Sequence, residues 1–243
     1  MLRRKGQIRT YEDNLQLAAF LSFTAGCVNV SGFIAFDVLT TNITGHVAFF
    51  AKWLSFGDVP TAFYFLAWML LFLIGSFISA LLVEWVGSKS PRFAHAIPIL
   101  IEASILFFVG SYSHLYYEHT DIQIRFLGGS LLFAMGFQNA MVTKISGSVV
   151  RTTHLTGMTT DLGIELAALL RNAKGINKKD LKKKILLQST IIFFFFAGGI
   201  CGGYAFQELL FHAFYLPAGI LMITLFYDTL RHGGFSFSSK DSH

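Results

Sequence analysis

The sequence predicts an all-α membrane protein with six transmembrane helices and two short re-entrant helices, built as two inverted three-helix repeats. Three observations predict this fold. Hydrophobic residues make up 53% of the 243 residues and only 14% are charged, which is more apolar surface than a soluble domain of this size can bury. Six apolar runs are long enough to cross about 30 Å of hydrocarbon. A polar phrase of six residues occurs twice, and the residues around it repeat in the same order, as in many secondary transporters.

Each predicted span is an apolar run of about 20 residues. In order, the six runs cover Leu15–Phe36, Thr61–Val86, Ala96–Tyr117, Phe126–Ser146, Ile185–Phe206 and Phe211–Leu230. The connections between them are short. We therefore expect a single membrane domain over residues 1–243, with repeat one at about 10–118 and repeat two at about 122–232.

The repeated phrase is Thr40–Gly45 in the first half and Thr152–Gly157 in the second. Further residues correspond in the same order: Gly26 with Gly136, Asn29 with Asn139, Gly75 with Gly199, Glu84 with Glu208, and Pro98 with Pro217. Because each half contains three spans, an odd number, the second half is predicted to be inverted relative to the first.

Charge orients the chain. With the N-terminus in the cytoplasm and six spans, 17 of the 19 Lys and Arg fall on the cytoplasmic side and only Lys52 and Arg125 lie outside, in agreement with the positive-inside rule. This predicts a multi-pass protein of the bacterial cytoplasmic (inner) membrane with both termini in the cytoplasm.

An alternative lets the short helix after each phrase complete a crossing, which gives eight spans and a parallel repeat. It places 15 of the 19 basic residues inside, so charge does not exclude it. The segment from Gly45 to Gly57 is only about 20 Å long as a helix at 1.5 Å per residue. Its length favours the six-span interpretation.

The repeated phrase interrupts membrane segments, where lipid cannot pair the freed backbone groups, so the break is expected to be buried in protein or to line a wet cavity. Thr hydroxyls can replace the missing backbone partners or cap the next helix, and Gly permits a sharp turn or a close approach of helices. The start of a helix favours negative charge. The phrase therefore predicts binding of a small polar or anionic solute by Thr41, Asn42, Thr44, Gly45, Thr153, His154, Thr156 and Gly157; a loop that only caps the two short helices is the alternative.

Asn29 and Asn139 occupy equivalent positions in the first span of each half, and Gln138 adjoins Asn139. An unpaired amide in hydrocarbon costs free energy, so each is expected to bond across helices or to face the cavity. We include all three among the predicted solute-binding residues, although helix association explains them equally well.

Carboxylates inside the membrane indicate a function more strongly than the amides do. Glu102 is the only charged residue in its span, and hydrocarbon disfavours the charged form of a carboxyl group, so Glu102 is a candidate proton carrier. Asp161 and Glu165 are four residues apart and share one face of the second short helix. Ion or proton coupling is predicted for these three residues; pairing of Asp161 with a nearby basic residue is the alternative.

Other partners and cofactors have little support. Cys27 and Cys201 lie inside predicted spans, the His residues lack metal-ligand spacing, and no phosphate-binding loop occurs. We expect no metal, no cofactor and no nucleic-acid partner. The basic cluster Lys178–Lys184 suits anionic lipid headgroups, so the expected partners are the lipid bilayer, a small-molecule solute and a second copy of the chain in a homo-oligomer.

The chain resembles the YoaK family of bacterial inner-membrane proteins over nearly its whole length. The resemblance rests on Gly26–Asn29, Thr40–Gly45, Gly136–Ala140 and Arg151–Gly157. The chain departs from the family pattern at Asn29 and His46, where such proteins often carry Asp and Asn. The resemblance implies a six-span membrane protein.

The predicted function is secondary transport by a permease, coupled to protons through Glu102 or Asp161. One alternative is an intramembrane enzyme that acts on a lipid or isoprenoid, with His154, Asp161 and Glu165 as acid, base or metal-binding groups. A further alternative is a membrane scaffold that transports nothing.

Overall fold

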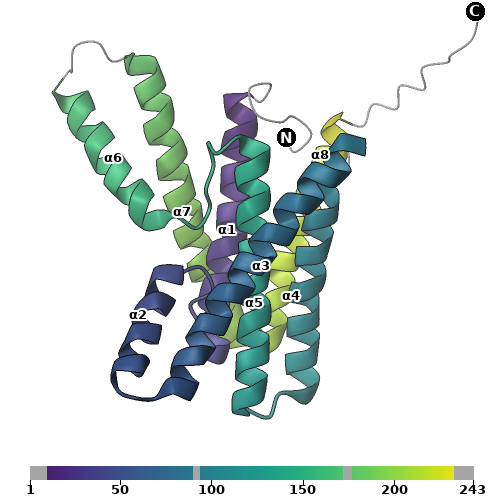
Figure 1. Cartoon of the computed structure of the whole chain (residues 1–243). Helices are drawn as coiled ribbons and strands as arrows, with labels where there is room; N and C mark the ends of the chain where they lie inside the picture. The colour runs from purple at the N-terminus through teal and green to yellow at the C-terminus, as the bar shows by residue number, and fades with distance from the viewer. Residues whose placement is uncertain (1–9, 90–93, 172–176, 233–243) are drawn as a thin grey trace, which may run out of the picture.

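The computed structural model describes residues 10–89, 94–171 and 177–232, and its regular elements in these ranges are helices (Figure 1). In chain order they are α1 (Tyr11–Phe36), α2 (Ile43–Ser55), α3 (Val59–Lys89), α4 (Ala96–Tyr116), α5 (Asp121–Ser146), α6 (Leu155–Leu170), α7 (Lys178–Leu209), the short 3-10 helix η2 (Leu210–Phe214) and α8 (Tyr215–His232).

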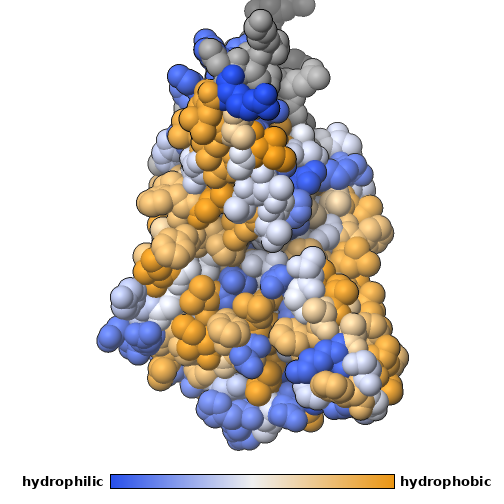
Figure 2. Space-filling view, turned by 90° about the vertical axis from the view of Figure 1, so that its left-hand side faces the viewer, coloured by the Kyte–Doolittle hydropathy of each residue, from blue (hydrophilic) through white to orange (hydrophobic). Residues whose placement is uncertain are grey.

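Five stretches of the described chain are long and apolar enough to cross a membrane: α1, α3, α4, α5 and one that joins α7, η2 and most of α8. The outer surface carries many large apolar side chains (Figure 2). In α3 only 22% of the most apolar window is buried inside the protein. Exposure of so much apolar surface to water is unfavourable, so the chain is a multi-pass helical membrane protein.

Helices α1 and α5 are built alike. Each has 26 residues and each begins after a threonine, Thr10 or Thr120, whose hydroxyl accepts a hydrogen bond from the amide three residues later. Each ends at a left-handed residue, Asp37 with φ 56° or Gly147 with φ 64°. The same caps at the same spacing start and stop both helices.

Glycines bring two helix pairs into close contact, α1 with α7 and α3 with α5. A Cβ on Gly26 would lie 2.8 Å from the carbonyl carbon of Phe195 in α7, and a Cβ on Gly136 would lie 2.9 Å from that of Phe72 in α3. Only a residue without a side chain permits this approach.

The reciprocal contacts involve Gly198 of α7 against Phe23 of α1, and Gly75 of α3 against Phe133 of α5. Gly75 therefore corresponds in packing to Gly198, and the predicted match of Gly75 with Gly199 is wrong by one residue. Gly198 and Gly199 are adjacent, and only the direction each faces in the folded helix distinguishes them.

Helix α7 begins at Lys178, earlier than the predicted span at Ile185. Asn177 caps it by accepting a hydrogen bond of 3.0 Å from the amide of Lys179. Hydropathy predicted the membrane-crossing part of the helix, whereas the cap sets where the helix starts.

The described basic residues separate along the bundle. Lys144 in the last turn of α5 and the lysines at the start of α7 lie at the end where α1 begins and α8 ends (Figure 1). Lys144 forms an ion pair there with Glu84 of α3. Lys52 and Arg125 lie toward the other end. The residues Arg3, Arg4, Lys5, Arg9, Arg92, Lys174 and Lys240, which also entered the charge count, lie outside the described residues.

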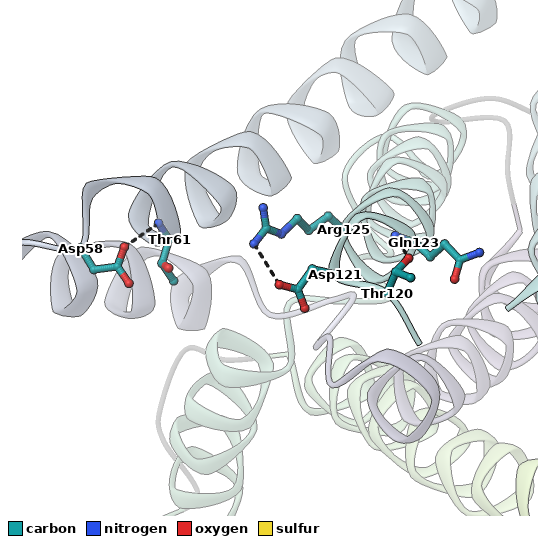
Figure 3. Close-up of polar contacts among 6 residues, drawn as sticks. All are labelled: Asp58, Thr61, Thr120, Asp121, Gln123 and Arg125. Atoms are coloured by element: carbon teal, nitrogen blue, oxygen red, sulfur yellow. Dashed lines mark hydrogen bonds and ion pairs between the residues drawn. The ribbon is translucent and has the colours of Figure 1, made fainter. Parts of the chain in front are cut away.

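At the opposite end, polar contacts stabilise the first turns of α3 and α5 (Figure 3), and others join the two helices. Arg125 pairs with Asp121 at 3.7 Å, and its guanidinium lies 3.1 Å from the centre of the Tyr64 ring. The Trp68 indole N–H donates to the backbone carbonyl of Arg125 at 3.1 Å. Asp58 caps α3 by accepting a hydrogen bond from the amide of Thr61 at 3.0 Å.

Candidate functional site

The two repeated phrases form the starts of the two short helices. In Figure 1, α2 and α6 lie on the same side of the bundle, begin near its mid-height and run toward opposite ends. Helix α2 packs mainly against α3, and α6 mainly against α7. Neither short helix is among the stretches long and apolar enough to cross a membrane.

The two phrases occupy equivalent environments. From Thr40 to Ala48 and from Thr152 to Thr160, the order of buried, half-buried and exposed residues is identical. Thr40 and Thr152 are fully buried, whereas Asn42 and His154 at the helix starts are exposed. The two phrases are therefore equivalent both in sequence and in the burial of their residues.

Asn29 holds the first break. Its side-chain oxygen in α1 accepts hydrogen bonds from the backbone amide of Thr41 at 3.1 Å and from the Thr41 hydroxyl at 3.0 Å. The Thr40 hydroxyl lies 3.5 Å from the same oxygen. Asn29 thus replaces a backbone acceptor that the interrupted helix no longer supplies.

Asn42 caps α2. Its side-chain oxygen accepts from the amide of Gly45 at 3.0 Å and from the hydroxyl of Thr44 at 2.9 Å. A Cβ on Gly45 would lie 2.8 Å from the Asn42 side-chain nitrogen. The glycine of the phrase therefore makes room for the capping side chain.

At the second break the cap differs. His154 starts α6 but accepts no hydrogen bond from the helix amides. Its ring lies against Gly157, where a Cβ would come within 2.9 Å of both ring nitrogens. Among the described residues, the amides of Leu155, Thr156 and Gly157 have no protein acceptor. Free amides at a helix start, next to an imidazole, can accept an anionic group.

Gln138 supports this break from the core. It is fully buried in α5, and its amide nitrogen donates to the carbonyl of Leu21 at 2.9 Å and to the hydroxyl of Thr152 at 3.3 Å. Neighbouring Asn139 is half-buried, and its side-chain oxygen has no hydrogen-bond partner among the described residues. Asn29 and Asn139 are thus equivalent in position but not in bonding.

Glu102 lies elsewhere, in the fully buried core of α4. Neither of its carboxyl oxygens has a hydrogen-bond partner among the described residues. The residue at the corresponding place in α8, Leu221, is equally buried. An unpaired carboxyl in such a place is costly when charged.

Asp161 and Glu165 differ in exposure. Asp161 is exposed, while Glu165 is half-buried against the start of α7. Glu165 lines a cavity of 360 Å³ together with Asp180 and Lys184 of α7. Burial raises the pKa of Glu165; the Lys184 ammonium opposes this and the Asp161 carboxylate adds to it.

A second cavity, larger than the one beside Glu165, is apolar and lies away from both breaks. It has a volume of 610 Å³ between α3, α4 and α5, and its lining includes Leu71, Phe108 and Phe133. The two hydroxyls in its wall, those of Ser104 and Ser130, each bond to a carbonyl of their own helix. Nothing in this lining would hold a polar solute, so cavity size alone is a poor guide here.

The structure therefore brings together Asn29, Thr41, Asn42, Thr44 and Gly45 at one break, and Gln138, Thr153, His154, Thr156 and Gly157 at the other. Glu102 belongs to neither. In the described ranges, no group of three or more His, Cys, Asp or Glu residues is placed to hold a metal. Sequence reasoning gave no separate role to Thr40 and Thr152; their position as the first residue of each phrase is the signal for their burial.

The comparisons with known proteins give one match. A family model described as a protein of unknown function (DUF1275) matches residues 17–227, and the chain belongs to this family. No curated protein and no solved structure matches it. The narrower resemblance to the YoaK family and the bacterial origin stay predictions.

Proposed function

We propose that this member of the DUF1275 family is a secondary transporter of a small polar or anionic solute, with its site between the starts of α2 and α6. One observation carries the proposal. Two short helices begin at mid-height with equivalent exposed polar residues and run toward opposite ends (Figure 1). Broken helices that meet near the midplane from opposite sides are how many transporters bind their solutes.

An inverted repeat is part of this proposal. Helices α1 and α5 share length and caps but run in opposite directions along the bundle (Figure 1). The glycine contacts of α1 with α7 recur between α5 and α3. A two-fold relation in the membrane plane, with three crossings in each half, accounts for both facts. On this proposal α2 and α6 re-enter the membrane from opposite faces, and both termini are cytoplasmic.

The start of α6 supports a preference of the site for a negatively charged solute. Asn42 occupies an amide of α2, whereas the first three amides of α6 have no protein acceptor among the described residues. The α6 dipole and these free amides attract a negative group. His154 and Thr156, both exposed beside them, add further donors.

Proton coupling is assigned to Glu102. Its carboxyl oxygens have no partner among the described residues, and the corresponding Leu221 shows that a hydrocarbon side chain fits an equivalent place. A carboxyl group kept where leucine suffices for packing is best explained by a function of the carboxyl itself.

The proposal is tested first without knowing the solute. Cys27 and Cys201 are replaced, and single cysteines at Thr44 and Thr156 are exposed to a charged, membrane-impermeant thiol reagent on either side of the membrane. We expect both to react from at least one side because they line a wet site. Cysteine at Leu132, which is fully buried in the core, is the control and should not react. Unreactive cysteines at both breaks would contradict a solute site there.

A second experiment tests coupling. Purified protein in liposomes that contain a pH-sensitive dye is offered chloride, phosphate, sulfate and acetate in turn. We expect proton movement with at least one anion, and its loss in Glu102→Gln. If the wild-type protein moves protons with none of these anions, proton-coupled transport of an anion is wrong; if Glu102→Gln moves protons normally, the coupling assignment is wrong.

A further inference from the structure

The interface between α6 and α7 is polar over several turns. On α6, Asp161 and Glu165 are four residues apart and share one face. On α7, Asp180, Lys184 and Gln188 follow one another at intervals of four residues, which places them along one side of that helix. The cavity of 360 Å³ between the two helices is lined by Glu165, Asp180 and Lys184. A row of polar side chains therefore runs along each helix of this pair.

Two oxygen atoms of these rows are buried and have no hydrogen-bond partner among the described residues, namely Oε2 of Glu165 and Oε1 of Gln188. A buried polar atom costs free energy until a donor pairs with it. The cavity beside Glu165 holds several water molecules at roughly 30 Å³ each, and Asp180 and Lys184 in its wall supply the further partners that a buried water needs. Water is therefore the ligand that this cavity fits.

The equivalent interface in the first half is aromatic. Counted from the start of each repeated phrase, Asp161 of α6 corresponds to Phe49 of α2. Counted from the glycines that make the reciprocal contacts, Gln188 of α7 corresponds to Phe65 of α3. The two phenylalanine rings stack with their centres 5.1 Å apart, and the His46 ring lies 6.0 Å from that of Phe65. Stacked rings offer water no polar partners, so the two interfaces differ in their capacity to hold water.

The polar row on α6 leads to the second break. His154 starts α6, and Asp161 and Glu165 follow it by seven and eleven residues. Because a helix turns 100° per residue, the three lie within about 40° of one another around the axis, over roughly 16 Å of its length. His154 and Asp161 are exposed, and an exposed carboxylate at membrane depth needs water. The other end of the path is Asp180, in the first turn of α7, at the end of the bundle where α1 begins (Figure 1).

We infer that the α6–α7 interface is a hydrated path by which water and protons pass from the end of the bundle where α7 begins to the second break, with Glu165 as its proton-exchanging residue. The α2–α3 interface is closed to them by its aromatic rings. The charged groups around Glu165 are Asp161 on its own helix and Asp180 and Lys184 on α7. Burial raises the pKa of Glu165, so this carboxyl takes up a proton at a pH closer to neutrality than a free one does.

The path deepens the proposed transport function, because it gives the second break an entrance from one end of the bundle. Its use in transport rests on that function. Hydration of the interface depends only on the cavity, the unpartnered oxygens and the charged groups beside them. Measurements of water and proton access therefore test the path without any transported solute, and the two proposals can fail separately.

Thiol accessibility tests the entry of water. In a chain without Cys27 and Cys201, a single cysteine at Gln188 is exposed to a small, charged, membrane-impermeant thiol reagent on each side of the membrane in turn. We expect it to react from the side on which α7 begins. Cysteine at Ile191, which is 1% exposed on the same helix, is the control and should not react. An unreactive cysteine at Gln188, or one that reacts only from the opposite side, would overturn the path.

Filling the interface with the residues of the first half tests whether the path reaches the break. A reporter cysteine at Thr156 is combined with Asp161→Phe and Gln188→Phe, which copy the stacked pair of the first half. We expect its reaction from the side where α7 begins to slow about tenfold or more, because the added rings exclude water. Leu166→Phe adds a ring to a side chain of α6 that does not line the cavity and should leave the rate unchanged. Equal rates in both variants and the unfilled reporter would overturn the path.

Deuterium exchange at the carboxyl groups tests proton access with the interface intact. The infrared band of protonated Glu165 is identified as the one that Glu165→Gln removes, and that of Glu102 as the one that Glu102→Gln removes. Protein in liposomes near pH 4.5, the usual pKa of a Glu carboxyl, is transferred to heavy water. We expect the Glu165 band to shift first, because Glu102 is fully buried in α4. Exchange at Glu165 no faster than at Glu102 would overturn the path, whether or not the protein transports a solute.

Discussion

Replacing Gly26 by alanine is expected to push α1 and α7 apart locally and so to destabilise the protein. The added Cβ would lie 2.8 Å from the carbonyl carbon of Phe195 and nearer still to its oxygen. Carbon atoms in favourable contact are about 3.5–4.0 Å apart, so the helices must separate locally by roughly 1 Å. A backbone carbonyl in the middle of α7 cannot rotate away as a side chain could.

The cost follows from that separation. Overpacking a well-packed core costs about 1–3 kcal/mol, and the upper end applies because the obstacle is backbone and Gly198 of α7 makes the reciprocal contact with Phe23. Alanine recovers about 1 kcal/mol of helix propensity over glycine. The net loss is about 2 kcal/mol, which corresponds to roughly 4–8 °C in melting temperature for a chain of this size.

Thermal unfolding in detergent, followed by the fluorescence of the tryptophans, measures this loss. Gly136→Ala should show a similar decrease, because its Cβ would meet Phe72 of α3 in the equivalent way. Gly219→Ala, which meets nothing, is the control and should be unchanged or slightly more stable. If Gly26→Ala has the same melting temperature as Gly219→Ala, the close contact of α1 with α7 is refuted.

Three further predictions follow from the same geometry. Asn29→Leu removes the acceptor of the Thr41 amide and hydroxyl and should lower the free energy of unfolding by about 1–3 kcal/mol. Asn139→Leu is the control, because the side-chain oxygen of Asn139 has no described partner at the equivalent position, and it should lower the melting temperature clearly less. Equal losses would contradict the role given to Asn29. Glu102→Leu should melt no lower than the wild type, because it removes an unpaired buried carboxyl, while abolishing proton movement in liposomes; a large loss of stability would show that Glu102 has a structural partner. Because burial raises the pKa of Glu165 above its usual 4.5, the folded state holds this proton more tightly than the unfolded state, so the contribution of Glu165 is fully present below about pH 4.5 and is lost as pH rises through the raised pKa. The melting temperature of the wild type relative to Glu165→Gln should therefore fall over that rise in pH, and a difference that grows instead would refute the burial of Glu165 against α7.

Much of the fold could be predicted because an apolar run of about 20 residues identifies a membrane helix from the sequence alone. The apolar runs predicted the long helices, and α2 and α6 begin within the repeated phrases. Capping signals such as Thr10 and Thr120 are equally local. These features depend on residues within a few positions of one another, so the sequence contains them in full.

The candidate site was predicted less completely. The phrase residues do gather at two breaks, but the sequence could not distinguish structural bonding from solute contact. Asn42 and Asn29 turn out to satisfy neighbouring backbone groups, whereas Asn139 does not. Such a distinction depends on which acceptor another helix presents, and that acceptor is more than a hundred residues away for Gln138.

The sequence by itself determined the membrane class and the long helices, because hydropathy and caps are properties of neighbouring residues. Only the tertiary structure decided that Gly198, rather than Gly199, meets the backbone of Phe23 in α1, and that both carboxyl oxygens of Glu102 are buried without a described partner. The physical reason is rotation: a helix turns 100° per residue, so which face a residue presents is fixed by how the helices pack against one another.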